Sequence, residues 1–321
     1  MIRAGVATLL AATLAAAAPA PVPEPAPVRL DAATVLIPGA IHPDRQPDGN
    51  SIVIAGSKGV LVIDTGRHAA HTAAVEHAVD ATGRPLVRIV NTHWHLDHVS
   101  GNSALKRRWP EARVSASDAI DAALGGFLKT SAEGGRAALA SGKLPEATAE
   151  DVRNDLATLD RSAELRPDNV VKTSGPLPGF DRPLELRLAR HAATAGDLWI
   201  YDRRAKRAIV GDLVTLPAPF LDTACPAGWS KALADVGRTP FRQLVPGHGP
   251  LMNRADFALY RTAFDQLLTC ATGNTPVATC GDGWTANAAR LIPAADTRRA
   301  TAMARYYAGL IRDGKLAGYC A

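Results

Sequence analysis

The stretch NTHWHLDH, residues 91–98, contains three histidines and one aspartate within eight positions. It follows directly after the apolar run LVRIV, whose β-branched residues predict a buried strand. An extended or turning segment at the end of that strand can direct alternate side chains toward one point. The donors then form two pairs, His93 with His95 and Asp97 with His98. Because neutral imidazole and carboxylate groups are ligands for zinc, this stretch predicts a metal site.

The rest of the chain predicts an α/β protein. Short apolar runs predict strands at 51–56, 60–64, 86–90, 113–117, 184–190, 197–202, 207–212 and 243–247. Helical patterns cover 67–82 and 103–109, a helical insertion at 118–165, and most of the chain from residue 253 onward. Strands interleaved with helices are typical of the α/β class. Four further histidines, at 42, 68, 71 and 77, are interpreted as ordinary surface or core residues.

The first residues resemble an export signal. Met1 and Arg3 precede an uncharged stretch over 4–18, and small residues follow where a signal peptidase cleaves, which predicts a signal peptide over 1–20. An alanine-rich anchor or an unstructured tail is the alternative. Residues 21–28 are proline-rich and predict a linker. We expect the main domain over 29–252 and a helical extension over 253–321. We therefore expect a periplasmic or secreted protein.

The composition indicates which kinds of binding partner to expect. The net charge is +5, but the basic residues are scattered and no run of them is interleaved with aromatic residues, so nucleic acid is not expected. Beyond the signal segment no stretch is apolar enough to span a bilayer. A small-molecule substrate is the expected partner.

Four cysteines predict two disulfide bonds in an exported chain. Three pairings are open for Cys225, Cys270, Cys280 and Cys320. The short loop between Cys270 and Cys280 makes that pair the simplest one, which leaves Cys225 to join Cys320 near the C-terminus. No pair has the C-x-x-C spacing of a zinc or redox motif.

The motif HWHLDH fits the signature H-x-H-x-D-H, and through it the chain resembles the metallo-β-lactamase superfamily. The likeness runs in order over about residues 48–252, through VLVIDTG around Asp64, GDLV at 211–214 and VPGHGP at 245–250. The resemblance implies an αββα sandwich of two mixed β-sheets flanked by helices. It also implies a dinuclear metal site at one edge of the sheets.

The resemblance implies a ligand for each motif position. His93 and His95 are then ligands of the first metal, Asp97, His98 and His248 are ligands of the second, and Asp212 bridges the two. Asp64 supports a ligand from behind without touching metal. Two zinc ions are expected, with a single ion as the alternative, and iron or manganese can share such a ligand set.

One ligand of the pattern is missing. The family has H-T-x-G-D before the following strand, and its histidine completes the first metal's set, but here the matching residues are Ala193 to Asp197. The nearest histidine, His191, would lie about 6–7 Å from position 193 along an extended strand. It can replace the missing ligand only if residues 191–195 loop out locally.

Two positions, Ala193 and Asp212, indicate which branches of the family the chain resembles least. Loss of the third histidine argues against the iron persulfide dioxygenases, and Asp212 argues against the β-lactamases that use a cysteine ligand. In layout the chain resembles exported zinc metallohydrolases found beside quinoprotein dehydrogenase systems. The resemblance implies a zinc-dependent hydrolase that uses a metal-bridging hydroxide, positioned by Asp97, on a small ester, thioester, lactone or lactam. The alternative is a non-catalytic or single-metal binding or accessory protein.

Overall fold

The computed structural model describes residues 25–42 and 44–321, so the predicted signal peptide over 1–20 lies outside the described residues. Twelve strands form two sheets in this part of the chain. The first sheet has the order β1-β2-β3-β4-β5-β6-β7, with bounds Val28–Asp31, Thr34–Ile37, Ser51–Ala55, Val60–Ile63, Leu86–Val90, Arg113–Ala116 and Asn169–Val170. The second has the order β12-β11-β10-β9-β8, with bounds Gln243–Val245, Arg207–Ile209, Gly196–Asp202, Leu184–Arg190 and Gly175–Pro176. Both sheets mix parallel and antiparallel pairs, as predicted.

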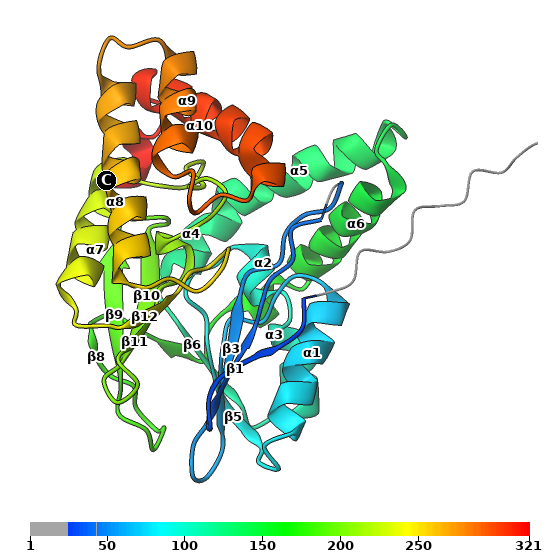
Figure 1. Cartoon of the computed structure of the whole chain (residues 1–321). Coiled ribbons are helices and arrows are strands. Elements are labelled where there is room, and N and C mark those ends of the chain that lie inside the picture. Colours follow the sequence, from blue (N-terminus) through cyan, green and yellow to red (C-terminus); the bar gives the residue numbers. More distant parts are fainter. Residues whose placement is uncertain (1–24, 43) are drawn as a thin grey trace, which may run out of the picture.

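Alternation along the strands builds the layers. In β3, Ile52 and Ile54 face the second sheet, whereas Val53 faces the opposite way, toward helices. In β10, Leu198 faces the first sheet, whereas Trp199 faces the helices on the other side. Since successive strand side chains point to opposite faces, a strand that is apolar throughout is buried on both faces. The two sheets therefore form a sandwich with helices outside it (Figure 1).

Helices cover the outer face of each sheet. On the first sheet lie α1 (Ala69–Asp80) and α3 (Asn102–Arg108), which pack against β3 to β6. On the second lie α7 (Pro226–Arg238) and α8 (Arg254–Thr272). The predicted helices over 67–82 and 103–109 are confirmed within two residues at each end.

Two further helical groups lie at one end of the sandwich (Figure 1). The insertion forms α4 (Ala119–Gly125), α5 (Phe127–Ala140), α6 (Glu146–Asp160) and the short η1 (Ser162–Leu165). The C-terminal part forms α9 (Val277–Asn287) and α10 (Thr297–Arg312), with the turns η3 (Ala294–Asp296) and η4 (Ala317–Cys320). Among the described residues no helix combines the length and apolar character needed to cross a bilayer.

The end of one predicted strand and the extent of the predicted linker differ from the structure. The strand predicted over 207–212 ends at Ile209, because Gly211 adopts a φ of +52° and begins the turn η2 (Gly211–Leu213). The predicted linker over 21–28 overlaps β1, whose first residue Val28 pairs with Leu36. Residue 28 therefore belongs to a β-strand and not to a free linker.

Disulfides join the C-terminal region to itself and to the second sheet's side of the molecule. The structure contains Cys270–Cys280 and Cys225–Cys320, the pairing favoured above. Cys225 directly precedes α7, and Cys320 ends η4. The last turn of the chain is therefore covalently attached beside the loop that follows η2.

Candidate metal centre

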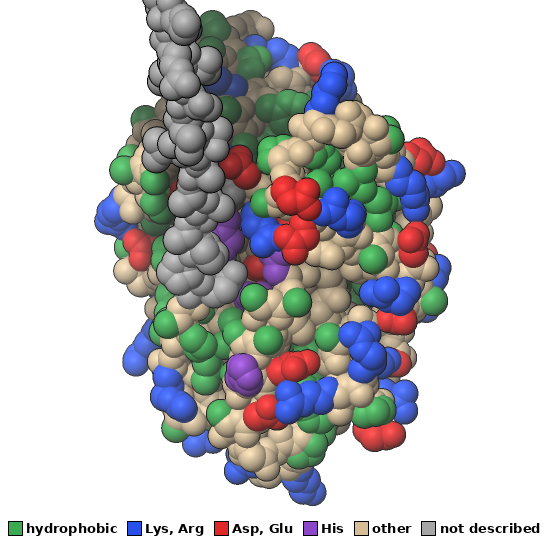
Figure 2. All heavy atoms as spheres, turned by 90° about the vertical axis from the view of Figure 1, so that its right-hand side faces the viewer, with side chains coloured by type: hydrophobic (Ala, Val, Ile, Leu, Met, Phe, Trp, Pro, Cys, Tyr) green, Lys and Arg blue, Asp and Glu red, His purple; other side chains and the backbone are tan. Residues whose placement is uncertain are grey.

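The predicted ligands converge at one edge of the sandwich, from segments that follow strands. His93 and His95 follow β5, Asp97 and His98 belong to the short helix α2 (Leu96–Val99), and Asp212 and His248 follow β11 and β12. All six side chains belong to buried residues. On the face seen in Figure 2, histidine side chains are visible in the middle of the molecule beside acidic and basic groups.

The donors of the second metal position face one another. The Nε2 atom of His98 lies 3.2 Å from Asp212 Oδ1, 3.3 Å from His248 Nε2 and 3.7 Å from Asp97 Oδ2. His248 Nε2 lies 3.0 Å from Asp97 Oδ2 and 3.5 Å from Asp212 Oδ1. Four donors at about 2.0–2.1 Å from a tetrahedral zinc ion lie about 3.3–3.4 Å apart. The spacing of this cluster therefore fits a metal ion.

An unsatisfied atom points the same way. Asp212 Oδ1 is buried and accepts no hydrogen bond in the structure. A buried carboxylate oxygen without a partner is costly, so its retention calls for a bound cation. The residues of the second position therefore fit the metal that the resemblance implies.

The first metal position has three donors. His93 Nε2 lies 2.9 Å from His95 Nδ1, and Asp212 Oδ2 lies 3.6 Å and 3.8 Å from these two nitrogens. A structural zinc site has four protein ligands, and a catalytic one has three plus water. The first position therefore has as many protein donors as a catalytic zinc site and one fewer than a structural zinc site.

Hydrogen bonds behind the ligands fix which nitrogen faces the metal. His98 Nδ1 donates to Asp64 Oδ2 at 2.8 Å, so its Nε2 lone pair faces the cluster. The Thr92 hydroxyl donates to the same carboxylate at 2.7 Å and can thus accept a hydrogen bond from His93 Nδ1 at 3.0 Å. Asp64 therefore orients one ligand of each position, directly or through Thr92.

His95 is oriented by a threonine that the sequence did not indicate. The Thr223 hydroxyl donates to the backbone carbonyl of Ala193 at 3.0 Å, so it accepts from His95 Nε2 at 3.0 Å. The Nδ1 lone pair of His95 consequently faces that of His93 at close range. Two lone pairs this close repel unless a proton or a metal ion lies between them.

His191 lies outside the cluster. Its φ is +50°, and the backbone between it and Ala195 does turn tightly, through a hydrogen bond from His191 N to Ala195 O. However, its Nδ1 donates to the Tyr319 carbonyl at 3.2 Å, on the C-terminal turn. The structure thus gives His191 a role in holding the C-terminus and leaves Ala193 without a substitute imidazole.

Burial and charge set the protonation of the cluster. Burial lowers the pKa of His93 well below its usual value, and the charge of His98 adds to that shift. Burial acts in the same direction on His98, but the carboxylates of Asp212 and Asp97 outweigh it and raise its pKa well above the usual range. Burial opposes ionisation of Asp97, yet its histidine neighbours hold the pKa of that carboxyl well below its usual range. The two ionised carboxylates are thus balanced by positive charge on His98, which a metal ion bound at its Nε2 would replace.

Glycines allow the backbone to approach the ligands. A Cβ at Gly247 would lie 2.0 Å from Asp212 Oδ1, and a Cβ at Gly49 would lie 2.3 Å from the His98 ring. Any larger residue at either position would displace a ligand.

Comparison with known proteins identifies the family. Residues 45–267 match the sequence model described as Metallo-beta-lactamase superfamily, which is more than half of the chain. The chain belongs to the metallo-β-lactamase superfamily. Members of this superfamily are mostly hydrolases. The fold predicted from the HWHLDH motif is confirmed.

Solved metallo-β-lactamases share the fold. One from Pontibacter korlensis is 19% identical, with a TM-score of 0.55, over 75% of this chain and 98% of that chain. The DIM-1 metallo-β-lactamase is 14% identical, with a TM-score of 0.55, over 76% of this chain and 98% of that one. One from Hirschia baltica is 16% identical, with a TM-score of 0.51, over 74% and 96%. At these identities the likeness shows the fold alone.

A short segment of the chain is similar to a hydrolase. A hydroxyacylglutathione hydrolase from a Synechococcus strain is 57% identical over 44 residues, which is 14% of this chain and 17% of that protein. The match thus spans about a sixth of that relative's length.

A cavity of about 290 Å³ opens over the cluster of predicted metal ligands. Its polar floor includes His95, Asp97, Asp212 and His248. Its apolar walls include Trp94, Phe127, Phe220, Met303 and Tyr307. Phe127 and Leu128 come from the insertion, which therefore forms part of the cavity wall.

The insertion also supplies charges that the sequence analysis missed. Asp155 of α6 forms an ion pair with the largely buried side chain of Arg67, whose Nη2 lies 3.8 Å from Asp97 Oδ1. Asp151, one turn earlier on α6, is fully buried and lies 3.0 Å from His68 Nε2. The i, i+4 spacing of the two aspartates was a readable signal for one helix face. Their partners became visible only in three dimensions.

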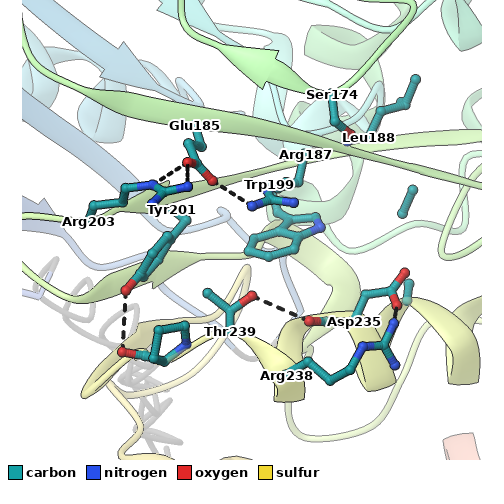
Figure 3. Close-up of a pocket in the computed structure, with 13 residues that line it drawn as sticks. Ser174, Glu185, Arg187, Leu188, Trp199, Tyr201, Arg203, Asp235, Arg238 and Thr239 are labelled. Carbon is teal, nitrogen blue, oxygen red and sulfur yellow. Dashed lines mark hydrogen bonds and ion pairs between the residues drawn. The ribbon is translucent and has the colours of Figure 1, made fainter.

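A second cavity, of about 660 Å³, lies between β9, β10 and α7 (Figure 3). No histidine or cysteine occurs among its lining residues, all of which belong to the described part. Its charged groups pair with one another: Glu185 with Arg187 and Arg203, and Asp235 with Arg238. Both of its carboxylates are therefore occupied by arginine partners.

Proposed function

We propose that this chain is a metal-dependent hydrolase that cleaves a small ester, thioester, lactone or lactam. The observation that carries the proposal is the four-donor cluster of Asp97, His98, Asp212 and His248, with its unsatisfied carboxylate oxygen, at the floor of an open cavity. An intact buried ligand set beneath a substrate-sized cavity is the usual arrangement of a catalytic metal site.

The two metal positions are proposed to bind zinc unequally. The second position, with four donors, binds first, and the first position, with His93, His95 and Asp212, binds a second ion more weakly. Iron or manganese remain alternatives in the same ligand set. When bound, such ions act as Lewis acids and lower the pKa of water toward neutrality.

The protein's own groups orient the reactants. Asp97, held ionised, accepts a hydrogen bond from the attacking water and aligns it with the substrate carbonyl carbon. Arg67, locked by Asp155, keeps the Asp97 carboxylate in place. Water adds to the carbonyl carbon, the bond to the leaving oxygen, sulfur or nitrogen breaks, and one water proton passes to that leaving atom.

The protein is further proposed to act outside the cytoplasm. The signal-like residues 1–20 and the two disulfides support this location, because disulfides persist in oxidising compartments. N-terminal sequencing of the protein recovered from a periplasmic or culture-medium fraction tests the cleavage site. A product that still begins at Met1 would contradict it.

A second function has one observation in its favour. Ala193 occupies the position at which the family motif has its third histidine. Its methyl group cannot bind a metal ion, and its carbonyl accepts a hydrogen bond from Thr223. A protein with one metal and no turnover, acting as a binding or accessory protein, would tolerate that change.

Metal counting and turnover separate the two functions. Mature protein from residue 21 is dialysed against trace zinc, analysed for metal, and assayed with one ester, one thioester, one lactone and one β-lactam. We expect at least one zinc per chain and hydrolysis that is lost with a chelator and restored by zinc. Stable metal binding without turnover of any of the four would favour the binding protein.

A further inference from the structure

One face of α10 lines the cavity over the metal cluster. Arg299, Met303 and Tyr307 all border this cavity and are spaced four residues apart. Side chains at i, i+4 and i+8 lie along the same helix face. At a rise of 1.5 Å per residue, Tyr307 and Arg299 are about 12 Å apart along the axis.

The two ends of this row differ in depth. Tyr307 is buried, and its ring lies 6.1 Å from that of Phe220, which lies 5.2 Å from the His95 ring. Its hydroxyl donates to Asp222 at 3.2 Å, so the ring rather than the hydroxyl is left for the cavity. Arg299 is exposed. The row therefore runs from the metal end of the cavity to its rim.

Two arginines line the cavity, and only one of them is available to a ligand. The side chain of Arg67 is largely buried and already paired with Asp155, and it also faces Asp97. Burial acts to lower the pKa of Arg67, but these two carboxylates raise it above its ordinary value. Arg299 makes no ion pair with a carboxylate anywhere in residues 25–42 and 44–321. Its guanidinium is thus the free cation of the cavity's described lining.

The surface between the metal end and the rim is apolar. Trp94 and Phe127 lie with ring centres 5.7 Å apart on one side, and Phe220 and Met303 contribute from the other segments. Such a surface binds a hydrocarbon chain through burial of apolar area, at about 25 cal/mol per Å².

We propose that the cavity selects acyl compounds with an apolar chain that ends in an anionic group, such as a carboxylate, and that Arg299 is the residue that determines this specificity. The reacting carbonyl lies at the metal end, the chain lies along the aromatic and Met303 surface, and the terminal anion pairs with Arg299. The reaction part of this assignment rests on the proposed hydrolase function, whereas the binding part does not.

Binding is tested with a pair of uncleavable probes on the purified, metal-containing protein. The probes are 8-(4-nitrophenoxy)octanoate and the matching alcohol, 8-(4-nitrophenoxy)octan-1-ol, and their Kd values are measured by calorimetry. We expect the carboxylate to bind about fivefold more tightly than the alcohol, the range of one partly exposed ion pair. Arg299→Gln should remove this preference, and Arg299→Glu should reverse it.

Arg298 provides a matched control. It is also exposed and pairs with no carboxylate of the described residues, and it lies next to Arg299 on the helix but does not border the cavity. Arg298→Gln and Arg298→Glu should keep the preference for the carboxylate. An unchanged preference in both Arg299 variants, or an equal loss in the Arg298 variants, overturns the assignment.

A kinetic comparison separates this inference from the proposed function. With the 4-nitrophenyl monoester of octanedioic acid and with 4-nitrophenyl octanoate, Arg299→Gln should raise KM about fivefold for the acidic ester only and leave kcat unchanged, since Arg299 is remote from the reacting atoms. If neither ester is cleaved but the probe preference depends on Arg299, the hydrolase proposal fails and the binding assignment stands. If both esters are cleaved and Arg299 variants change nothing, the specificity assignment fails alone.

Discussion

The two metal positions share Asp212 but differ in completeness. The second position contains four donors with spacings of 3.0–3.7 Å among the measured pairs, close to the edges of a tetrahedron around zinc. The first contains two histidine nitrogens and one oxygen, and Ala193 stands where a further imidazole is expected.

The difference is confined to one side chain. The remaining donors of the first position still have oriented rings, because Thr92 fixes His93 and Thr223 fixes His95. The supporting hydrogen bonds of the first position are therefore present although that position has one donor fewer than the second. A site with its supports intact is expected to bind metal weakly rather than not at all.

The largest effect is expected from removing a donor of the complete position. His248→Ala should lower zinc retention after dialysis and reduce any hydrolysis by more than about a hundredfold, since a direct ligand matters more than its supports. Elemental analysis and initial rates measure this. His77→Ala, at an exposed histidine on α1, is the control and should retain both. Full zinc retention in His248→Ala would mean that the complete position is not the tight one.

Restoring the missing imidazole should make the two positions alike. Ala193→His is expected to tighten binding of the second ion by about a hundredfold and to bring the zinc content at trace zinc to two per chain. Zinc titration against a competing chelator measures the change. Ala195→His, in the same turn, is the control and should leave the affinities unaltered. An unchanged second affinity in Ala193→His would show that geometry, not the missing donor, limits the first position.

Weakening the shared support should affect both positions moderately. Asp64→Asn keeps a residue type that tolerates the φ of +57° but removes the charge behind His98 and Thr92. We expect a loss of about tenfold in zinc affinity. Asp44→Asn, at an exposed residue with a φ of +60°, controls for the backbone effect. Equal affinities for the two variants would remove Asp64 from the support role.

The last effect concerns the pH dependence of folding stability rather than metal affinity, and it involves Asp197, which precedes Leu198 in β10. Burial raises the pKa of this carboxyl to about 8 from the usual 3.8. The folded state thus keeps a proton that the unfolded state loses above pH 3.8, so its stabilising contribution is complete at low pH and falls as pH rises toward 8. The slope is at most about 1.4 kcal/mol per pH unit.

Asp197→Asn should lack that slope. Urea unfolding of metal-free protein at several pH values between 5 and 8 measures the difference between the variant and the native chain. The free energy of unfolding of Asp197→Asn should rise relative to the native chain as pH increases. A constant difference across this range would show that Asp197 titrates at its ordinary pKa.

Much of the fold, and the residues that meet at the candidate metal centre, were predictable from the sequence. The strand run VLVI (60–63) is apolar at every position, and LVRIV (86–90) is apolar at all positions but Arg88, which favours burial between a second sheet and a layer of helices. The spacing of His93, His95, Asp97 and His98 is local, so the motif itself carries the information. Asp212 and His248 followed from the ordered resemblance, since each comes directly after a recognisable strand.

Contacts between distant segments were decided only by the tertiary structure. Thr223 supports His95 across 128 positions of sequence, and Arg67 meets Asp155 across 88. The direction of His191, toward Tyr319 rather than toward the metal cluster, depends on where the disulfide-linked C-terminus packs. Sequence periodicity determines which side of an element is apolar, because it reflects the repeat of the backbone. It does not determine which distant polar group lies opposite a given side chain, because that depends on how the folded layers are placed against one another.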